Sequence, residues 1–224
     1  PIPLARALPI MIQVSRGIAR AHDLEVIHRD LKPENIFIAR RDDGSDLVKL
    51  LDFGIARSAQ DSRLTGVGEV FGTPQYMAPE RITSIDAGGS QDLYALGVIF
   101  FEMITSTLPF EANDVPTFLL KHLKEPAPKI SSRGVQVPPE LENLVDSLMA
   151  KDPKQRPVDA HKVHSELVAI SAKVGIQPPP EIQHEQRTAA RAPAATLPPV
   201  TIDRWARRLI VFERPGRGGR ERLA

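Results

Sequence analysis

Residues 28–35 read His28-Arg29-Asp30-Leu31-Lys32-Pro33-Glu34-Asn35, a polar string that stands between a predicted helix and a predicted β-hairpin. Before it, apolar side chains in residues 4–22 recur at alternating steps of three and four, the spacing of an amphipathic helix. After it, residues 35–39 and 47–51 are short apolar runs, and the polar spacer between them contains an Asp-Gly pair typical of hairpins. A second string, Asp52-Phe53-Gly54, follows the second run. Both strings are therefore predicted to lie in loops at strand ends.

Four side chains in these strings carry chemistry suited to phosphate. Asp30 offers a carboxylate that can orient a hydroxyl and accept its proton, and Lys32, two residues on in an extended loop, can present an ammonium on the same side. Asn35 and Asp52 supply hard oxygen ligands, which Mg²⁺ takes together with substrate phosphates. Each residue alone also fits a turn former or a strand cap. As a set, they favour phosphoryl transfer over that structural interpretation.

A third string, Ala78-Pro79-Glu80, closes the polar region that follows. In this order, the three strings resemble the C-terminal catalytic lobe of serine/threonine protein kinases, particularly those of the bacterial eukaryotic-like family. The resemblance covers roughly residues 4–170. It implies an α+β fold that is mostly α-helical, with a short β-hairpin at the active site, and a transferase that uses ATP and Mg²⁺ to phosphorylate protein Ser and Thr. Its catalytic residues would be Asp30 and Lys32, and its nucleotide-binding residues Lys32, Asn35 and Asp52, with Asn35 and Asp52 on the metal.

Five further residues match structural parts of the same family. Asp92 resembles the aspartate that holds the backbone around His28 and Arg29, and Glu80 with Arg156 resembles a buried ion pair that anchors the long loop. Without the resemblance, Asp92 is predicted to be a helix N-cap and Arg156 a surface charge.

Residues 52–80 resemble an activation segment, which is predicted to be ordered by phosphorylation because Arg29 could pair with the added phosphate. The segment offers four candidate hydroxyls: Ser58, Ser62, Thr65 and Thr73. We expect Thr65 to be the phosphorylated residue, because bacterial relatives carry one at that spacing, with an unmodified polar residue as the alternative. Thr73 resembles the substrate-docking threonine that contacts Asp30 and Lys32. Lys32 and Thr73 together resemble serine/threonine kinases rather than tyrosine kinases.

Residues 92–106 are apolar on almost every face, which predicts a buried central helix. Residues 54–91 show little periodicity and predict a long irregular region. Further helices are predicted at 116–124, 139–150 and 157–170. The histidines outside the first string, which have no acidic or cysteine cluster around them in the sequence, are predicted to need no special role. The catalytic unit is thus expected to span residues 1–172.

Residues 173–224 differ from this unit in composition. From Ser171 onward there are ten Lys and Arg against five Asp and Glu, a net +5, which leaves −4 for residues 1–170 because the whole chain carries +1. Proline, alanine and arginine are frequent, which predicts a linker or tail. A short helix over residues 202–212 is possible from the spacing of Trp205, Leu209 and Phe212.

Composition excludes several classes of protein. The 42% hydrophobic and 25% charged residues are typical of a folded chain, and no apolar run reaches the length of a membrane span. The net charge near zero gives no reason to expect nucleic acid as a partner. The chain has no cysteine and no secretory leader pattern, so a cytoplasmic protein is expected.

The resemblance also shows what this sequence lacks. A complete kinase has an N-terminal lobe with a Gly-rich loop and a strand lysine on the phosphates. No such strand precedes residue 28, and Gly66-Val67-Gly68-Glu69-Val70-Phe71-Gly72 has the wrong glycine spacing and position to replace the loop. We therefore expect the N-terminal lobe to be absent and residues 1–224 alone to transfer little phosphate. The alternative is an inactive half-kinase that acts as a protein-binding or scaffold module.

Overall fold

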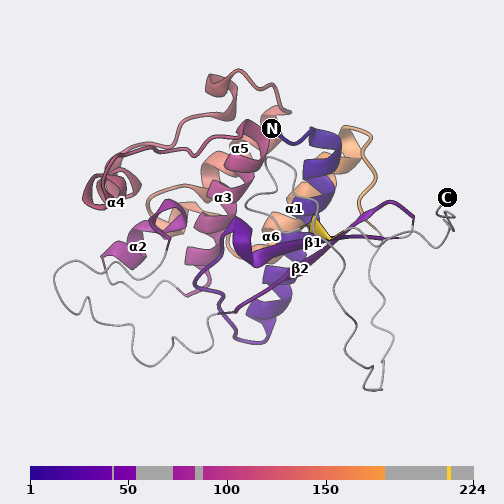
Figure 1. Ribbon diagram of the computed structural model, residues 1–224, viewed down its shortest axis with the longest axis horizontal. Coiled ribbons are helices and arrows are strands. Elements are labelled where there is room, and N and C mark those ends of the chain that lie inside the picture. The colour runs from indigo at the N-terminus through magenta and orange to yellow at the C-terminus, as the bar shows by residue number, and fades with distance from the viewer. Residues whose placement is uncertain (42, 54–72, 84–87, 180–210, 213–224) are drawn as a thin grey trace, which may run out of the picture.

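The structure is a computed structural model, and it describes residues 1–41, 43–53, 73–83, 88–179 and 211–212. Helices form most of it, and one small sheet lies against them (Figure 1). The longer elements are α1 (Leu4–Asp23), β1 (Ile36–Arg40), β2 (Asp46–Leu50), α2 (Pro79–Ile82), α3 (Ser90–Thr105), α4 (Val115–Lys124), α5 (Pro139–Leu148), α6 (Ala160–Lys173) and β3 (Val211–Phe212). Short 3₁₀ turns are η1 (Pro33–Asn35), η3 (Pro74–Tyr76), η4 (Ile130–Arg133) and η5 (Pro153–Gln155).

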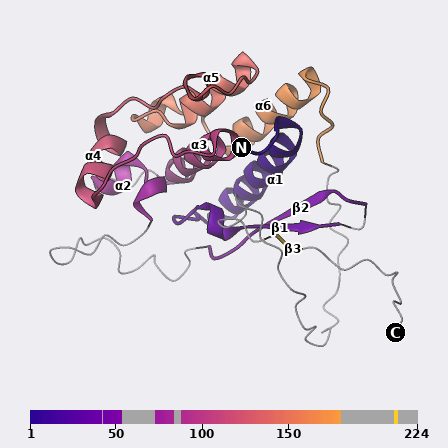
Figure 2. The same cartoon turned by 45° about the horizontal axis from the view of Figure 1, so that its top comes forward.

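Helix α3 is the centre of the core. Every residue from Gln91 to Thr105 is buried, as expected for a helix without a polar face. It packs against α1 and α5, and α1 in turn lies between α3 and the sheet (Figure 2). Gly97 allows the close approach of α5, because a Cβ at this position would stand 2.8 Å from Leu148 Cβ. The helix that carries Asp92 is therefore buried and packed closely against its neighbouring helices.

The β1–β2 hairpin brings the segment before β1 and the segment after β2 to the same end of the sheet. Its antiparallel register pairs Ile36 with Leu50, so the residue before β1 and the residues after β2 lie at the same end. Helix α1 holds the hairpin through Gln13, whose Oε1 accepts the Val48 N–H at 3.1 Å and whose Nε2 donates to the Asp46 carbonyl at 3.0 Å. Gln13 is buried, so these two hydrogen bonds attach the hairpin to the core and are shielded from water.

The third strand corrects one prediction. Val211 and Phe212 form β3, which pairs in parallel with Ile38 and Ala39 of β1. The predicted helix over residues 202–212 is therefore wrong at its last two residues. Valine and phenylalanine favour strands, and the edge of β1 offers unpaired backbone groups. Residues 202–210 lie outside the described part of the chain.

The predicted irregular region 54–91 is also more regular than expected at its C-terminal end. Turn η3, helix α2 and the first residues of α3 all lie within it, while residues 54–72 and 84–87 lie outside the described residues. Prolines at the first positions of η3 and α2 favour these short helical starts. Over the described ranges, no helix combines the length and the apolar character that crossing a lipid bilayer requires.

Candidate functional site

A buried carboxylate on α3 holds the loop that carries Asp30. Asp92 Oδ2 accepts the His28 backbone N–H at 2.8 Å, and Oδ1 accepts the Arg29 N–H at 2.9 Å. Asp92 is not the N-cap of its helix: Gly89 holds that position, and the Asp92 side chain turns to the loop. The prediction of a cap is therefore wrong, because two backbone donors from another segment compete for the same oxygens.

Asp30 and Lys32 lie together and face Thr73. The Lys32 Nζ stands 2.9 Å from Asp30 Oδ2 and 3.3 Å from Thr73 Oγ1. The side chains of Asp30 and Lys32 are 16% and 23% exposed, so the pair is partly sheltered but open to a ligand. The structure thus brings together the carboxylate and the ammonium of the first string and the hydroxyl of Thr73, which is about 40 residues away in the sequence.

Asn35 joins this loop from the start of the hairpin. Its Nδ2 donates to the Asp30 carbonyl at 2.8 Å, which fixes the amide group and directs its oxygen to the opposite side. The residue is buried at the end of η1. The hairpin and the Asp30 loop are therefore locked to each other by the amide that the sequence predicts to be a metal ligand.

Asp52 lies at the same end of the hairpin, beyond β2. It is exposed and has a positive φ of 51°. The backbone of the preceding residue is held at both its polar groups: the Leu51 N–H donates to the Asn35 carbonyl at 2.9 Å, and Nε2 of the buried His28 ring stands 3.0 Å from the Leu51 carbonyl oxygen. His28 also contacts Phe53, with ring centroids 4.7 Å apart. His28 thus links the Asp52 segment to the Asp30 loop.

The oxygens of Asn35 and Asp52 fit a magnesium ion that is shared with a ligand. In the part of the chain that the structure describes, no cluster of three or more His, Cys, Asp or Glu side chains could hold a metal by itself. Mg²⁺ is usually held by one or two protein oxygens together with phosphates and water. A small set of hard oxygen donors suits that arrangement and does not suit zinc or another ion that takes nitrogen and sulfur ligands.

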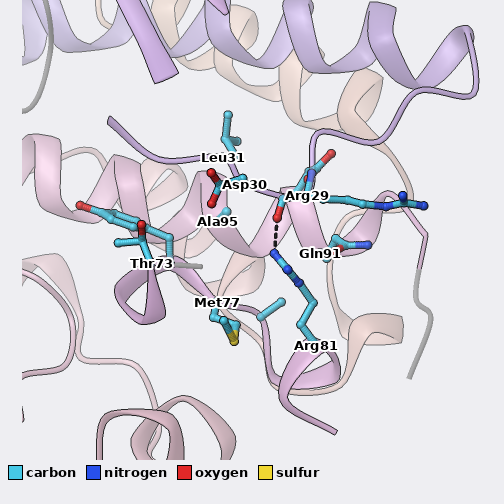
Figure 3. Close-up of a pocket in the computed structure, with 11 residues that line it drawn as sticks. Arg29, Asp30, Leu31, Thr73, Met77, Arg81, Gln91 and Ala95 are labelled. Carbon is cyan, nitrogen blue, oxygen red and sulfur yellow. Dashed lines mark hydrogen bonds between the residues drawn. The ribbon is translucent and has the colours of Figure 1, made fainter. Parts of the chain in front are cut away.

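A pocket opens between the Asp30 loop, the η3–α2 segment and the start of α3 (Figure 3). Asp30 and Thr73 lie on it, and Arg81 reaches across to donate to the Arg29 carbonyl (Figure 3). Its walls are formed by Arg29, Asp30, Leu31, Thr73, Tyr76, Met77, Ala78, Arg81, Gln91, Asp92 and Ala95. The pocket is therefore next to the carboxylate that would orient a hydroxyl.

A buried ion pair anchors the far side of this segment. The Arg156 guanidinium donates to both Glu80 oxygens, at 2.6 and 2.8 Å, and the two side chains are 0% and 3% exposed. It also donates to the Ser90 carbonyl at 2.9 Å and the Ala150 carbonyl at 2.9 Å. Arg156 is thus buried rather than on the surface, and α2 is tied to α3 and to the loop after α5.

A second buried cluster was not predicted. His122 on α4 is completely buried, and its Nδ1 stands 2.9 Å from the Tyr94 hydroxyl, beside Phe110 and Phe118. Burial, with Lys151 nearby, lowers the pKa of His122 to about 3, so the ring is neutral. Burial likewise lowers the pKa of Lys151 to about 8. The neutral His122 ring and the Tyr94 hydroxyl join α4 to α3, a pairing that sequence spacing alone does not reveal.

Two other histidines have acidic partners that the sequence did not indicate. His22 stands 2.9 Å from Asp92, and His161 stands 2.7 Å from Asp23. Both partners are distant in the sequence from their histidines, so only the packing of the helices brings them together. The predicted phosphorylation site, Thr65, lies outside the described residues, as do Ser58 and Ser62.

A family model and several curated proteins match this chain. The family described as protein kinase domain matches residues 2–168. Serine/threonine-protein kinase pkn3 of Myxococcus xanthus is 40% identical over 176 residues, which are 76% of this chain and 32% of that protein. Serine/threonine-protein kinase PknD of Mycobacterium tuberculosis is 41% identical over 157 residues, 70% of this chain and 23% of that protein. The chain therefore spans about a third or less of the length of these relatives.

A solved structure is similar as well. The crystal structure of Rad53 1–466 in complex with AMP-PNP has a TM-score of 0.60 and 27% identity to this chain, and the match covers 75% of this chain and 41% of that one. Because the family match begins at residue 2, the expected absence of an N-terminal lobe stays a prediction.

Proposed function

This chain belongs to the protein kinase family, with serine/threonine kinases of bacteria among its relatives, and we propose that it forms the catalytic lobe in which Asp30 directs phosphoryl transfer to protein Ser and Thr. The observation that carries the proposal is the contact of Lys32 with both Asp30 and Thr73. This contact supports the proposal because a carboxylate, an ammonium and a hydroxyl meet beside the pocket.

The reaction needs positioning and charge more than covalent work by the protein. The Asp30 carboxylate orients the substrate hydroxyl and accepts its proton as the oxygen bonds to the γ-phosphorus of ATP. The bond from that phosphorus to the β–γ bridging oxygen breaks, and ADP leaves. Lys32, held 2.9 Å from Asp30, places its charge where the transferred phosphoryl group passes.

Asn35 and Asp52 would hold Mg²⁺ on the ATP phosphates. The ion, when bound, neutralises charge on the phosphate oxygens. Asn35 is suited to this role because its donor group is engaged by the Asp30 carbonyl, which orients the amide oxygen away from that carbonyl. Asp52 is suited because its carboxylate is exposed while its neighbours are anchored by His28 and Asn35.

Thr73 supports a preference for serine and threonine. Its hydroxyl reaches Lys32 from the η3 side, so a substrate chain that docks there passes close to Asp30. We extend the proposal to regulation: phosphorylation of Thr65 would give Arg29 an anionic partner. The cysteine-free composition supports a cytoplasmic, reducing environment for the enzyme.

We propose that transfer also needs an N-terminal lobe, whose absence from residues 1–224 is a prediction from the sequence. The sequence has no Gly-rich loop followed by a strand lysine, and these groups cover and position the phosphates in kinases. We therefore propose that these 224 residues bind metal and nucleotide weakly and transfer phosphate only when an N-terminal lobe is supplied.

A paramagnetic ion tests the metal and nucleotide site directly, even at weak affinity. Mn²⁺ accepts the same oxygen ligands as Mg²⁺. Adding Mn²⁺·AMP-PNP to ¹⁵N-labelled protein is expected to broaden the amide signals around Asn35 and Asp52, and Asp52→Ala is expected to remove the effect. Asp43→Ala, an exposed aspartate at the turn of the same hairpin, is the matched control and should change nothing. Broadening spread over the surface, or unchanged in Asp52→Ala, would contradict the site.

A further inference from the structure

Lys151, in the loop between α5 and η5, has unusual neighbours for a lysine side chain. Its Nζ lies over the ring of Phe110, 4.4 Å from the ring centroid, and 5.7 Å from the ring centroid of Tyr94. Both aromatic residues are buried, whereas Lys151 is half-buried. The ammonium is therefore placed against two aromatic rings, while the residue keeps some access to water.

The polar contacts of this ammonium are long. Lys151 Nζ donates to the Tyr94 hydroxyl at 3.4 Å and to the Lys121 carbonyl at 3.5 Å, both beyond the roughly 2.7–3.2 Å typical of N–H···O bonds. Within the described ranges, ion pairs with carboxylates are formed by other lysines, such as Lys121 with Glu125 at 3.2 Å, and not by Lys151. The ammonium has three N–H donors, so the water that it loses on burial is poorly replaced.

The charged groups around Lys151 act in opposite directions. Arg156, whose guanidinium carbon lies 5.0 Å from the same Tyr94 ring centroid, disfavours a second positive charge, and Glu125 at the end of α4 favours it. The buried His122 ring is neutral and adds no charge. Burial has the largest effect, and it lowers the pKa of Lys151 to about 8. The surroundings therefore favour the neutral amine over the ammonium.

We propose that Lys151 is an acylation site, whose Nζ takes the acyl group of a small activated donor, an acyl phosphate or an acyl thioester. The neutral amine attacks the carbonyl carbon and an N–C bond forms. The bond from that carbon to the phosphate oxygen or the thiol sulfur breaks, and the amine proton passes to water. The product amide is uncharged, so the contacts of the ammonium with Phe110 and Tyr94 are lost. This site does not use the Asp30 loop, and the inference does not rest on the proposed function.

Limited acetylation of residues 1–224, with mass spectrometry of each lysine, tests the inference without any activity assay. The protein is treated at pH 7.5 with acetyl phosphate in one arm and with the thioester S-acetyl-N-acetylcysteamine in the other. Initial rates are compared for Lys151 and Lys154. Lys154 is the matched control in the same molecule, because it follows in η5 and is exposed. The same reactions in concentrated urea measure both lysines without the folded surroundings.

We expect Lys151 to react about tenfold faster than Lys154 at pH 7.5 with at least one donor. About a quarter of Lys151 is unprotonated at that pH, compared with roughly one part in a thousand of an ordinary lysine. The gain in rate is smaller than this ratio, because a less basic amine is a weaker nucleophile and partial burial slows the approach of the donor. The preference should shrink as the pH rises above 9 and should vanish in urea. A preference seen with one donor alone identifies that donor class.

Three results would overturn the inference. The first is a Lys151 rate equal to or below that of Lys154 with both donors at pH 7.5. The second is a preference for Lys151 that persists in urea, because the local sequence and not the folded site would then be its cause. The third is a Lys151 rate that rises with pH in parallel with that of Lys154, because the two amines would then be protonated alike.

Discussion

Replacing Arg156 with alanine should be among the most destabilising changes to this chain. The guanidinium is 0% exposed, donates to both Glu80 oxygens, and also satisfies the carbonyls of Ser90 and Ala150. Arg156→Ala would leave Glu80, 3% exposed, as a buried charge without its partner. Breaking a buried pair from one side costs about 3–5 kcal/mol of unfolding free energy. This is a large share of the roughly 5–15 kcal/mol that stabilises a typical domain.

Urea denaturation followed by circular dichroism gives the magnitude. With a slope of about 2 kcal/mol per molar urea, the expected loss moves the midpoint down by roughly 1.5–2.5 M. The control is Lys162→Ala, which removes an exposed pair with Glu166 on α6, whose side chains are 55% and 38% exposed. That variant should lose at most about 0.5 kcal/mol.

The double variant Glu80→Gln/Arg156→Met distinguishes two contributions to the unfolding free energy: the destabilisation by an unpaired buried charge and the stabilisation by the ion pair itself. Removing both charges leaves no unpaired ion, so the double variant should be more stable than Arg156→Ala. A loss below about 1 kcal/mol in Arg156→Ala would refute the reasoning, and so would a double variant that is less stable than Arg156→Ala.

Three further predictions concern titration and packing. The hydrogen bond to Asp23 is the chief reason that the pKa of His161 is raised. The stability that this contact adds is therefore fully present below pH 6.5 and is lost as the pH rises through the higher pKa of the folded state. The difference in unfolding free energy between the native protein and His161→Gln should disappear over that range. Burial lowers the pKa of His122 to about 3, so its NMR signals should not titrate between pH 8 and pH 5. On acidification below pH 6.5, the native protein should lose more unfolding free energy than His122→Phe does. Titration of His122 near pH 6.5 would contradict its burial. Gly97→Ala should cost roughly 1–3 kcal/mol in the same urea assay because its Cβ would meet Leu148 at 2.8 Å, and a neutral outcome would contradict the close approach of α3 and α5.

Local patterns predicted most of the helices and the hairpin. The apolar spacing of α1 and the all-round apolar character of α3 each specify a helix without reference to the rest of the chain. The expected ranges 4–22 and 92–106 differ from the observed helices by at most two residues at any end. Such ends depend on capping contacts, which apolar spacing does not encode.

Contacts between distant segments could not be predicted from the residues alone. The resemblance indicated that Asp92 would hold the backbone around His28, and the structure places it there, but the pairing of Asp92 with His22 carried no local signal. His122 is another case, because its neutral, buried state follows from the packing of α4 against α3. The spacing of apolar residues predicts a helix that includes Val211 and Phe212, because a strand of two residues has no periodicity to detect.

The most direct test of the central claim is phosphoryl transfer from radiolabelled ATP to a Ser/Thr protein substrate. Residues 1–224 alone should transfer a negligible amount. A chimera that adds the N-terminal lobe of a related kinase before residue 2 should transfer phosphate, and Asp30→Asn in that chimera should abolish transfer while its Mn²⁺·AMP-PNP broadening persists. Transfer that is undiminished by Asp30→Asn would contradict the role assigned to Asp30 and, with it, the account of this site.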